Sequence, residues 1–135
     1  MGSIRRHKPS SRAPTLATAF AFSFALLAPA GALAQQAPRS FEASPDVYKV
    51  VAEDSKFRLI EVTWKPGQRD KTHSHGAFTA IYNLTDCHTK AYLPDGKVAT
   101  NNRKAGEARF GVQSSSHSIE NVGSKECKVL IFEPK

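Results

Sequence analysis

The sequence predicts an all-β domain, and three observations carry this prediction. Beyond residue 46 the chain is a series of short runs rich in β-branched and aromatic residues, with turn residues such as Pro66-Gly67 between them. No stretch combines a sustained 3.6-residue repeat with capping residues, as a helix would require. Seven or eight such runs in about 90 residues are typical of a sandwich, a jelly roll or a small barrel. Periodicity alone leaves these three architectures open.

Alternation and turn chemistry justify the individual strands. In Phe57–Trp64, the residues Ile60, Val62 and Trp64 point to one face of an extended chain, opposite to Leu59, Glu61 and Thr63. Pro94-Asp95-Gly96 predicts a hairpin, because proline presets φ and glycine accepts a positive φ. The expected strands are Val47–Val51, Phe57–Trp64, Phe78–Leu84, Cys87–Leu93, Lys97–Asn101, Ala108–Val112, Ser118–Val122 and Lys128–Phe132.

Residues 1–34 have the organisation of a secretory signal peptide. Met1–Thr15 is polar and basic, Leu16–Ala28 is an uninterrupted run of apolar and small residues, and Ala32-Leu33-Ala34 forms an A-x-A cleavage pattern. The apolar run is shorter than the roughly 20 residues that span a bilayer. We therefore expect an exported protein, periplasmic or secreted, with no stable membrane anchor after cleavage. An uncleaved N-terminal anchor is the alternative.

The positive charge of the chain lies largely in this signal segment. The whole sequence has 19 basic and 12 acidic residues, a net charge of +7. Four of the basic residues and none of the acidic ones fall in residues 1–34, which leaves 15 against 12, or +3, for the remainder. A nucleic-acid footprint needs a basic patch on the folded domain. The composition therefore gives no reason to expect a nucleic-acid partner.

After cleavage we expect a flexible leader over residues 35–47 and one folded domain over residues 48–135. The leader is rich in Gln, Ala, Pro and Ser, which predicts little burial. The domain contains two cysteines, Cys87 and Cys127, and an exported protein meets an oxidising environment in which they can form a disulfide. Two buried free thiols are the alternative, because sequence gives no distance between them.

Three histidines are spaced as metal ligands. His73 and His75 stand at i and i+2, so on an extended chain their imidazoles share a face and lie about 6.5–7 Å apart. Neutral imidazole is the commonest metal ligand in proteins. His117 provides a third imidazole at a defined distance along the chain. His88 has no comparable companion and His7 lies in the signal segment.

The surroundings of these histidines resemble the two conserved motifs of small single-domain cupins. Gly67 precedes His73-x-His75 at the spacing of the first motif, G-x5-H-x-H. Gly106, His117 and Asn121 keep the spacing of the second motif, in which Val112 replaces a proline and Ser114 a glycine. The resemblance covers nearly all of residues 48–135. It implies a conical β-barrel of the double-stranded jelly-roll type, with a site in the barrel mouth.

One departure from the cupin pattern concerns the acidic ligand. Cupins usually carry a glutamate three or four residues after the second histidine, where this chain has Thr79 and Ala80. The resemblance therefore implies a site made of His73, His75 and His117 alone, like the three-histidine iron site of cupin-type thiol dioxygenases. We expect a divalent transition metal (Fe, Mn, Ni or Zn), whose uncompensated charge favours a small anionic ligand.

The remaining site residues are less well determined by sequence. A strand residue points inward about half the time, so each of several polar side chains is a weak candidate for lining the barrel: Glu61, Tyr82, Arg58, Arg69 and Arg109. Asn121 is expected to fix its loop through side-chain hydrogen bonds. By analogy with small cupins, a homodimer is also expected.

Three functions fit these features. The first is a metal-dependent enzyme that acts on a small anionic substrate by oxygenation, isomerisation or decarboxylation. The second is a non-enzymatic module that binds a small molecule or a metal. The third is an interaction protein whose barrel has lost its metal. Fold alone does not choose among them, because cupins host many unrelated activities.

Overall fold

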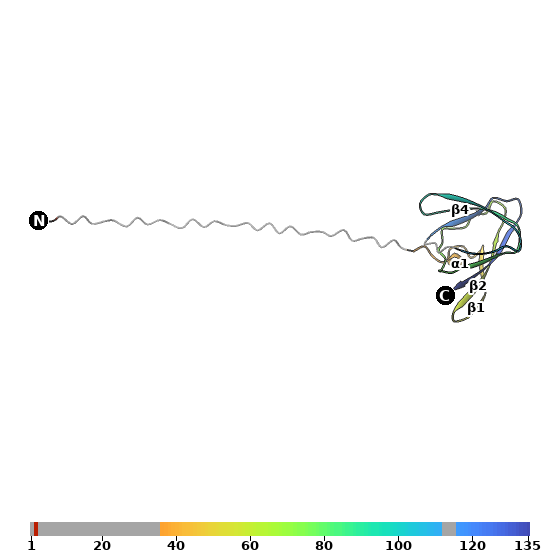
Figure 1. Ribbon diagram of the computed structural model, residues 1–135, viewed down its shortest axis with the longest axis horizontal. Helices are drawn as coiled ribbons and strands as arrows, with labels where there is room; N and C mark the ends of the chain where they lie inside the picture. The colour runs from red at the N-terminus through yellow and green to blue at the C-terminus, as the bar shows by residue number, and fades with distance from the viewer. Residues whose placement is uncertain (1, 3–35, 112–115) are drawn as a thin grey trace. The chain divides into compact units, whose positions relative to one another are not determined.

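The computed structural model describes residues 2, 36–111 and 116–135, and these form a β-rich domain. The expected signal segment, apart from Gly2, lies outside the described residues. The elements are α1 (Ser40–Ala43), β1 (Tyr48–Glu53), β2 (Phe57–Trp64), β3 (Ala80–Asn83), β4 (Cys87–Tyr92), β5 (Val98–Arg103), β6 (Ala108–Phe110), β7 (Ser118–Asn121) and β8 (Cys127–Pro134) (Figure 1). The predicted all-β class is confirmed.

The strands form two antiparallel sheets. One has five strands in the order β1-β2-β8-β3-β6, and the other has three in the order β5-β4-β7. Strands distant in sequence are thus neighbours in space, as a jelly roll requires. The expected hairpin joins β4 to β5, with Gly96 at a φ of 80°. Each expected strand is present in the described chain, and most of their ends differ by one or two residues.

The core lies on the inward faces of the five-stranded sheet. Ile60, Val62 and Trp64 of β2 are buried, as their alternation predicted. Along β8 the buried residues also alternate, and they include Ile131 and, one step further, Glu133. The sequence pattern therefore places a carboxylate in the inward row of the last strand, at one end of the hydrophobic core.

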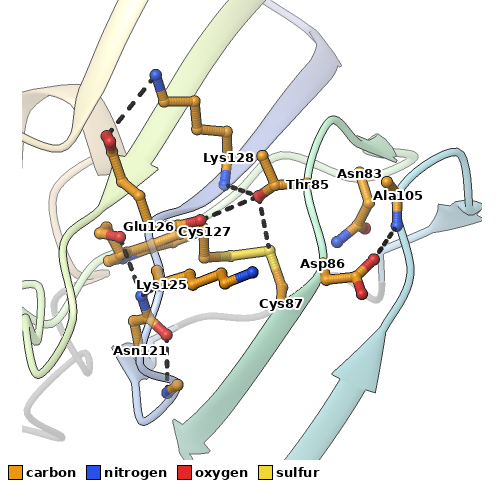
Figure 2. Close-up of a disulfide and its surroundings, with 12 residues drawn as sticks. Asn83, Thr85, Asp86, Cys87, Ala105, Asn121, Lys125, Glu126, Cys127 and Lys128 are labelled. Carbon is orange, nitrogen blue, oxygen red and sulfur yellow. Dashed lines mark hydrogen bonds and ion pairs between the residues drawn. A yellow bond between two sulfur atoms is a disulfide. The ribbon is translucent and has the colours of Figure 1, made fainter.

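A disulfide between Cys87 and Cys127 connects the two sheets (Figure 2). The first residue of β4 is thereby tied to the first residue of β8, across 40 positions of sequence, with a Cα–Cα distance of 4.9 Å. Both cysteines are buried. Of the two alternatives that the sequence left open, the structure has the bridge.

The expected flexible leader is wrong for residues 36–47. This segment forms α1 and packs on the barrel, with Ser40 and Val47 buried. Arg39 donates to the buried carboxylate of Glu133 at 2.8 Å. The polar composition misled the prediction because small serine side chains fit against the barrel and the partner of Arg39 lies 94 residues away. Within the described ranges, no helix has the length and apolar character to cross a membrane.

Removing the disulfide is expected to lower the free energy of unfolding by about 4 kcal/mol, because a closed loop of 40 residues restricts the unfolded chain. Urea unfolding of the oxidised protein, compared with the Cys87→Ala/Cys127→Ala double variant, measures the difference. A thiol assay of the denatured, unreduced protein is the control. Two reactive thiols in that assay would contradict the bridge.

Candidate metal centre

Backbone pairing brings the two histidine segments together. The N–H of His73 donates to the carbonyl of His117 at 2.8 Å, and the N–H of His117 donates to the carbonyl of His73 at 2.9 Å. The preceding residues continue this antiparallel contact beside β7, where the Gly67 N–H donates to the Asn121 carbonyl at 2.8 Å. His73 and His117, which are 44 positions apart in the sequence, are thus hydrogen-bonded directly to each other.

The glycines that begin the two motifs are required by backbone conformation. Gly67 has a φ of 75° and Gly106 a φ of 85°, in the left-handed region where a side chain is strained. Each lies in a tight turn that precedes a site-bearing segment. Val112 and Ser114, the positions where the second motif departs from the cupin pattern, lie outside the described residues.

The three imidazoles converge on one point. A ligand nitrogen from each of His73, His75 and His117 lies within 4.8 Å of the others. The Nε2 atoms of His73 and His75 are 3.1 Å apart. His73 is completely buried and His75 nearly so. The structure therefore brings together all three histidines that the sequence singled out.

The tautomer of His73 follows from its neighbours. Its Nδ1 lies 2.8 Å from the carbonyl oxygen of Lys71, which can only accept, so Nδ1 carries the proton. The neutral ring then has a bare lone pair on Nε2. The Tyr48 hydroxyl lies 3.2 Å from this Nε2, but it donates its proton to Asp70 at 2.7 Å. Burial, reinforced by Asp70, raises the pKa of Tyr48 well above its usual value, so the phenol stays protonated.

His75 is oriented by a buried carboxylate. Its Nδ1 lies 3.5 Å from Oε2 of Glu133, which is completely buried. This is an ion-pair distance rather than a close hydrogen bond, and it favours a proton on Nδ1. The other oxygen of Glu133 accepts from Arg39, and Arg58 lies 3.6 Å from it.

The Nε2 atoms of His73 and His75 lie 3.1 Å apart, within hydrogen-bond distance, and the tautomer of His75 decides whether its Nε2 donates to His73 or presents a second lone pair. That separation is also close to what two nitrogens bound about 2.0–2.1 Å from one ion would have. Burial lowers the pKa of His73, and burial with repulsion from the other two rings lowers the pKa of His117 to about 3. These two ligands are neutral at pH 7, and the donor set fits a divalent transition metal.

Asp70 is the polar anchor behind the site. Its Oδ2 accepts hydrogen bonds from the Tyr48 hydroxyl at 2.7 Å and from the Trp64 indole at 2.9 Å. Its Oδ1 accepts from the backbone N–H of Ile119 at 2.6 Å and lies 3.6 Å from Nδ1 of His73. One buried carboxylate therefore links β1, β2 and β7 to the first histidine.

The position of the missing cupin glutamate holds no carboxylate. The Thr79 hydroxyl there donates to the carbonyl of Gly76 at 3.0 Å. Two buried carboxylates lie behind the imidazoles instead, Asp70 beside His73 and Glu133 beside His75. Glu133 is already paired with Arg39 and Arg58, so only Asp70 would offset part of the charge of an ion held here.

The weaker candidates divide into inward and outward side chains. Arg109 lines the interior cavity. Arg58 contacts Glu133 and stacks on Phe41, while Arg69 donates to the hydroxyl of Ser118. Tyr82 and Glu61 do not line that cavity. Asn121 has the predicted structural role, because its amide donates to the carbonyls of Trp64 and Lys125 and accepts from the N–H of Gly123 (Figure 2).

Sequence reasoning missed Asp70 and Glu133. Glu133 had a readable signal, because it continues the alternation of Val129 and Ile131 into the inward row of the last strand. Asp70 had none, since it lies in an irregular segment and its role depends on partners from three strands.

Comparisons with known proteins agree with this architecture. No family model matches the chain, and no curated protein matches it. Among solved structures, a cupin domain from Bordetella pertussis Tohama I superposes with a TM-score of 0.61 at 17% identity, over 75% of this chain and 98% of that one. The chain has the cupin fold.

Two further cupin-like structures match over a smaller share. An RmlC-like cupin family protein with a double-stranded β-helix fold from Methanocaldococcus jannaschii gives a TM-score of 0.53 at 12% identity, over 65% of this chain and 78% of that one. The polyketide cyclase RemF from Streptomyces resistomycificus gives 0.51 at 23%, over 64% and 63%. At these identities the likeness concerns the cupin fold and not the activity.

Replacing Asp70 with asparagine is expected to destabilise the protein by about 2–3 kcal/mol, because one carbonyl oxygen cannot accept from all three donors and at least one remains buried and unpaired. Urea unfolding compares Asp70→Asn with Asp46→Asn, which makes the same chemical change at an exposed position. Equal midpoints for the two variants would contradict the anchoring role.

Proposed function

We propose that this protein is an exported metal-binding cupin that holds one divalent transition metal through His73, His75 and His117 and takes a small anionic ligand in its barrel. The observation that carries the proposal is the convergence of the three imidazoles, which place one ligand nitrogen each within 4.8 Å of one another. When bound, the ion would supply Lewis acidity toward an oxygen donor of the ligand.

The chain's own residues hold the ligand rings ready for this role. The Lys71 carbonyl keeps the proton of His73 on Nδ1, away from the centre. Glu133 lies 3.5 Å from Nδ1 of His75 and is held in place by its ion pair with Arg39. Such outer contacts raise ligand basicity and fix ring orientation.

The anionic character of the ligand is supported by the interior cavity of about 350 Å³, which His75 and His117 help to line. The described residues that line it include Arg103 and Arg109 and no carboxylate. Export is supported by the three-part organisation of residues 1–34.

Protein purified from the exported fraction without a histidine tag is expected to contain close to one transition-metal ion per chain. The His73→Ala and His117→Ala variants should lose at least about tenfold of that metal, because two imidazoles alone bind weakly. Elemental analysis measures the content, and intact mass checks for a chain beginning at Gln35. His88→Ala, at an exposed position on β4, is the matched control. No metal in the wild type after reconstitution would leave a metal-free barrel.

We further propose that the outer face of the five-stranded sheet is a homodimer interface. A water-facing antiparallel sheet normally alternates to polar residues on that side. Here an apolar row crosses four strands in register, from Leu59 through Phe132 and Ala80 to Phe110. Phe110 is 85% exposed and Phe132 is 43% exposed. A flat apolar row of this kind suits a second copy related by a two-fold axis.

Phe110→Asp is expected to convert the dimer to a monomer, because the charge would be buried against the partner's apolar row. Light scattering after size-exclusion chromatography measures the mass. Val98→Asp makes the same kind of change at an exposed valine of the other sheet and should leave the dimer intact. A monomeric wild type, or equal masses for both variants, would contradict the interface.

A further inference from the structure

The interior cavity has a second polar end. Its walls are largely apolar and include Ile81, Ile119 and Ile131, and His75 and His117 lie at the metal centre. Asn83 and Arg109 also line it. The backbone of Asn83 pairs with Val129 on β8. Val129 lies four residues before Glu133, which faces His75, so the backbone positions of Val129 and Glu133 are about 13 Å apart.

Asn83 presents a buried donor with no acceptor. Its side chain is completely buried, and its Oδ1 accepts from the Arg109 guanidinium at 2.7 Å. This contact fixes the amide orientation, because a flipped amide would place a donor against a donor. Nδ2 is then left without a hydrogen-bond partner in the described part of the chain. An unsatisfied buried donor is unfavourable, so its retention indicates an acceptor that the chain itself does not provide.

Arg109 makes no ion pair among the described residues, although its guanidinium is partly buried. The carboxylate of Glu107 attracts it only from beyond ion-pair distance. The undescribed internal residues 112–115 are Val, Gln, Ser and Ser, and residues 3–35 contain no acidic residue, so no carboxylate of this chain is hidden there. Figure 2 shows Asn83 in the neighbourhood of the disulfide, whose cysteines line the same cavity. A positive group and an unpaired donor therefore lie together on an acid-free wall.

We propose that Asn83 and Arg109 bind the carboxylate of a small organic acid whose apolar body lies along the isoleucine-lined wall, with its other end toward the three histidines. One guanidinium and one amide match the two oxygens of a single carboxylate. The apolar walls favour an organic acid over an inorganic anion. The inference rests on the proposed function in one respect only, namely that the other end of the ligand meets a metal ion held by the three histidines.

The test uses straight-chain monocarboxylates of two to eight carbons, each paired with its uncharged amide, and inorganic phosphate as a separate probe. Titrations followed by ¹H–¹⁵N NMR report on the side-chain NH₂ of Asn83 and on Nε of Arg109. We expect at least one carboxylate to shift both signals and its amide to bind at least tenfold more weakly. No binding by any carboxylate, or equal shifts with phosphate, would overturn the proposal.

Two variants separate recognition from a structural role. Arg109→Gln removes the positive charge and should weaken carboxylate binding at least tenfold. Asn83→Asp should abolish binding yet raise the melting temperature, because the new carboxylate would pair with Arg109 internally. Arg69→Gln, a matched change outside the cavity, should bind normally. A lower melting temperature for Asn83→Asp together with unchanged binding would overturn the proposal.

Metal content distinguishes failure of this inference from failure of the proposed function. Arg109→Gln and Asn83→Asp should keep the wild-type metal content. His117→Ala should lose the metal and still shift the Asn83 signal with the carboxylate. Carboxylate binding without metal in the wild type would support this subsite alone, whereas metal without carboxylate binding would overturn it and leave the metal centre standing.

Discussion

The three-histidine site depends on one buried carboxylate. Asp70 accepts from a phenol on β1, an indole on β2 and a backbone N–H of β7, and it lies beside the first histidine. These strands belong to both sheets. The irregular segment between β2 and β3, which carries His73 and His75, gains its fixed position from this convergence. A single polar residue thus couples closure of the barrel to the arrangement of the ligands.

Backbone pairing and the disulfide complete this coupling from two other directions. The reciprocal hydrogen bonds of His73 and His117 place the two histidine segments in register, so main-chain pairing positions the third histidine. The bridge from Cys87 to Cys127 joins the sheets at the start of β4 and β8. Along β8 the inward row then runs from Cys127 through the apolar core to Glu133, and the same strand serves the disulfide, the cavity wall and His75.

Local patterns predicted much of this structure, and long-range partners account for what they missed. Alternation placed Ile60, Val62 and Trp64 in the core, and motif spacing selected the three histidines that converge. The ordered segment before β1 was missed because Arg39 is held by Glu133, at the other end of the chain. Asn83 was missed because an amide in a strand reads as a neutral polar residue. Its candidate role depends on its contact with Arg109 on the neighbouring strand.

The arrangement of charge inside the barrel favours one orientation of a bound ligand. Asp70 lies behind His73 and would offset part of the charge of an ion bound there, whereas Glu133 behind His75 is paired with Arg39 and Arg58. Arg103 and Arg109 lie on the cavity wall without a carboxylate among the described lining residues. The arginines therefore favour one orientation of an entering acid, with its carboxylate at Asn83 and Arg109 and its uncharged end toward the histidines.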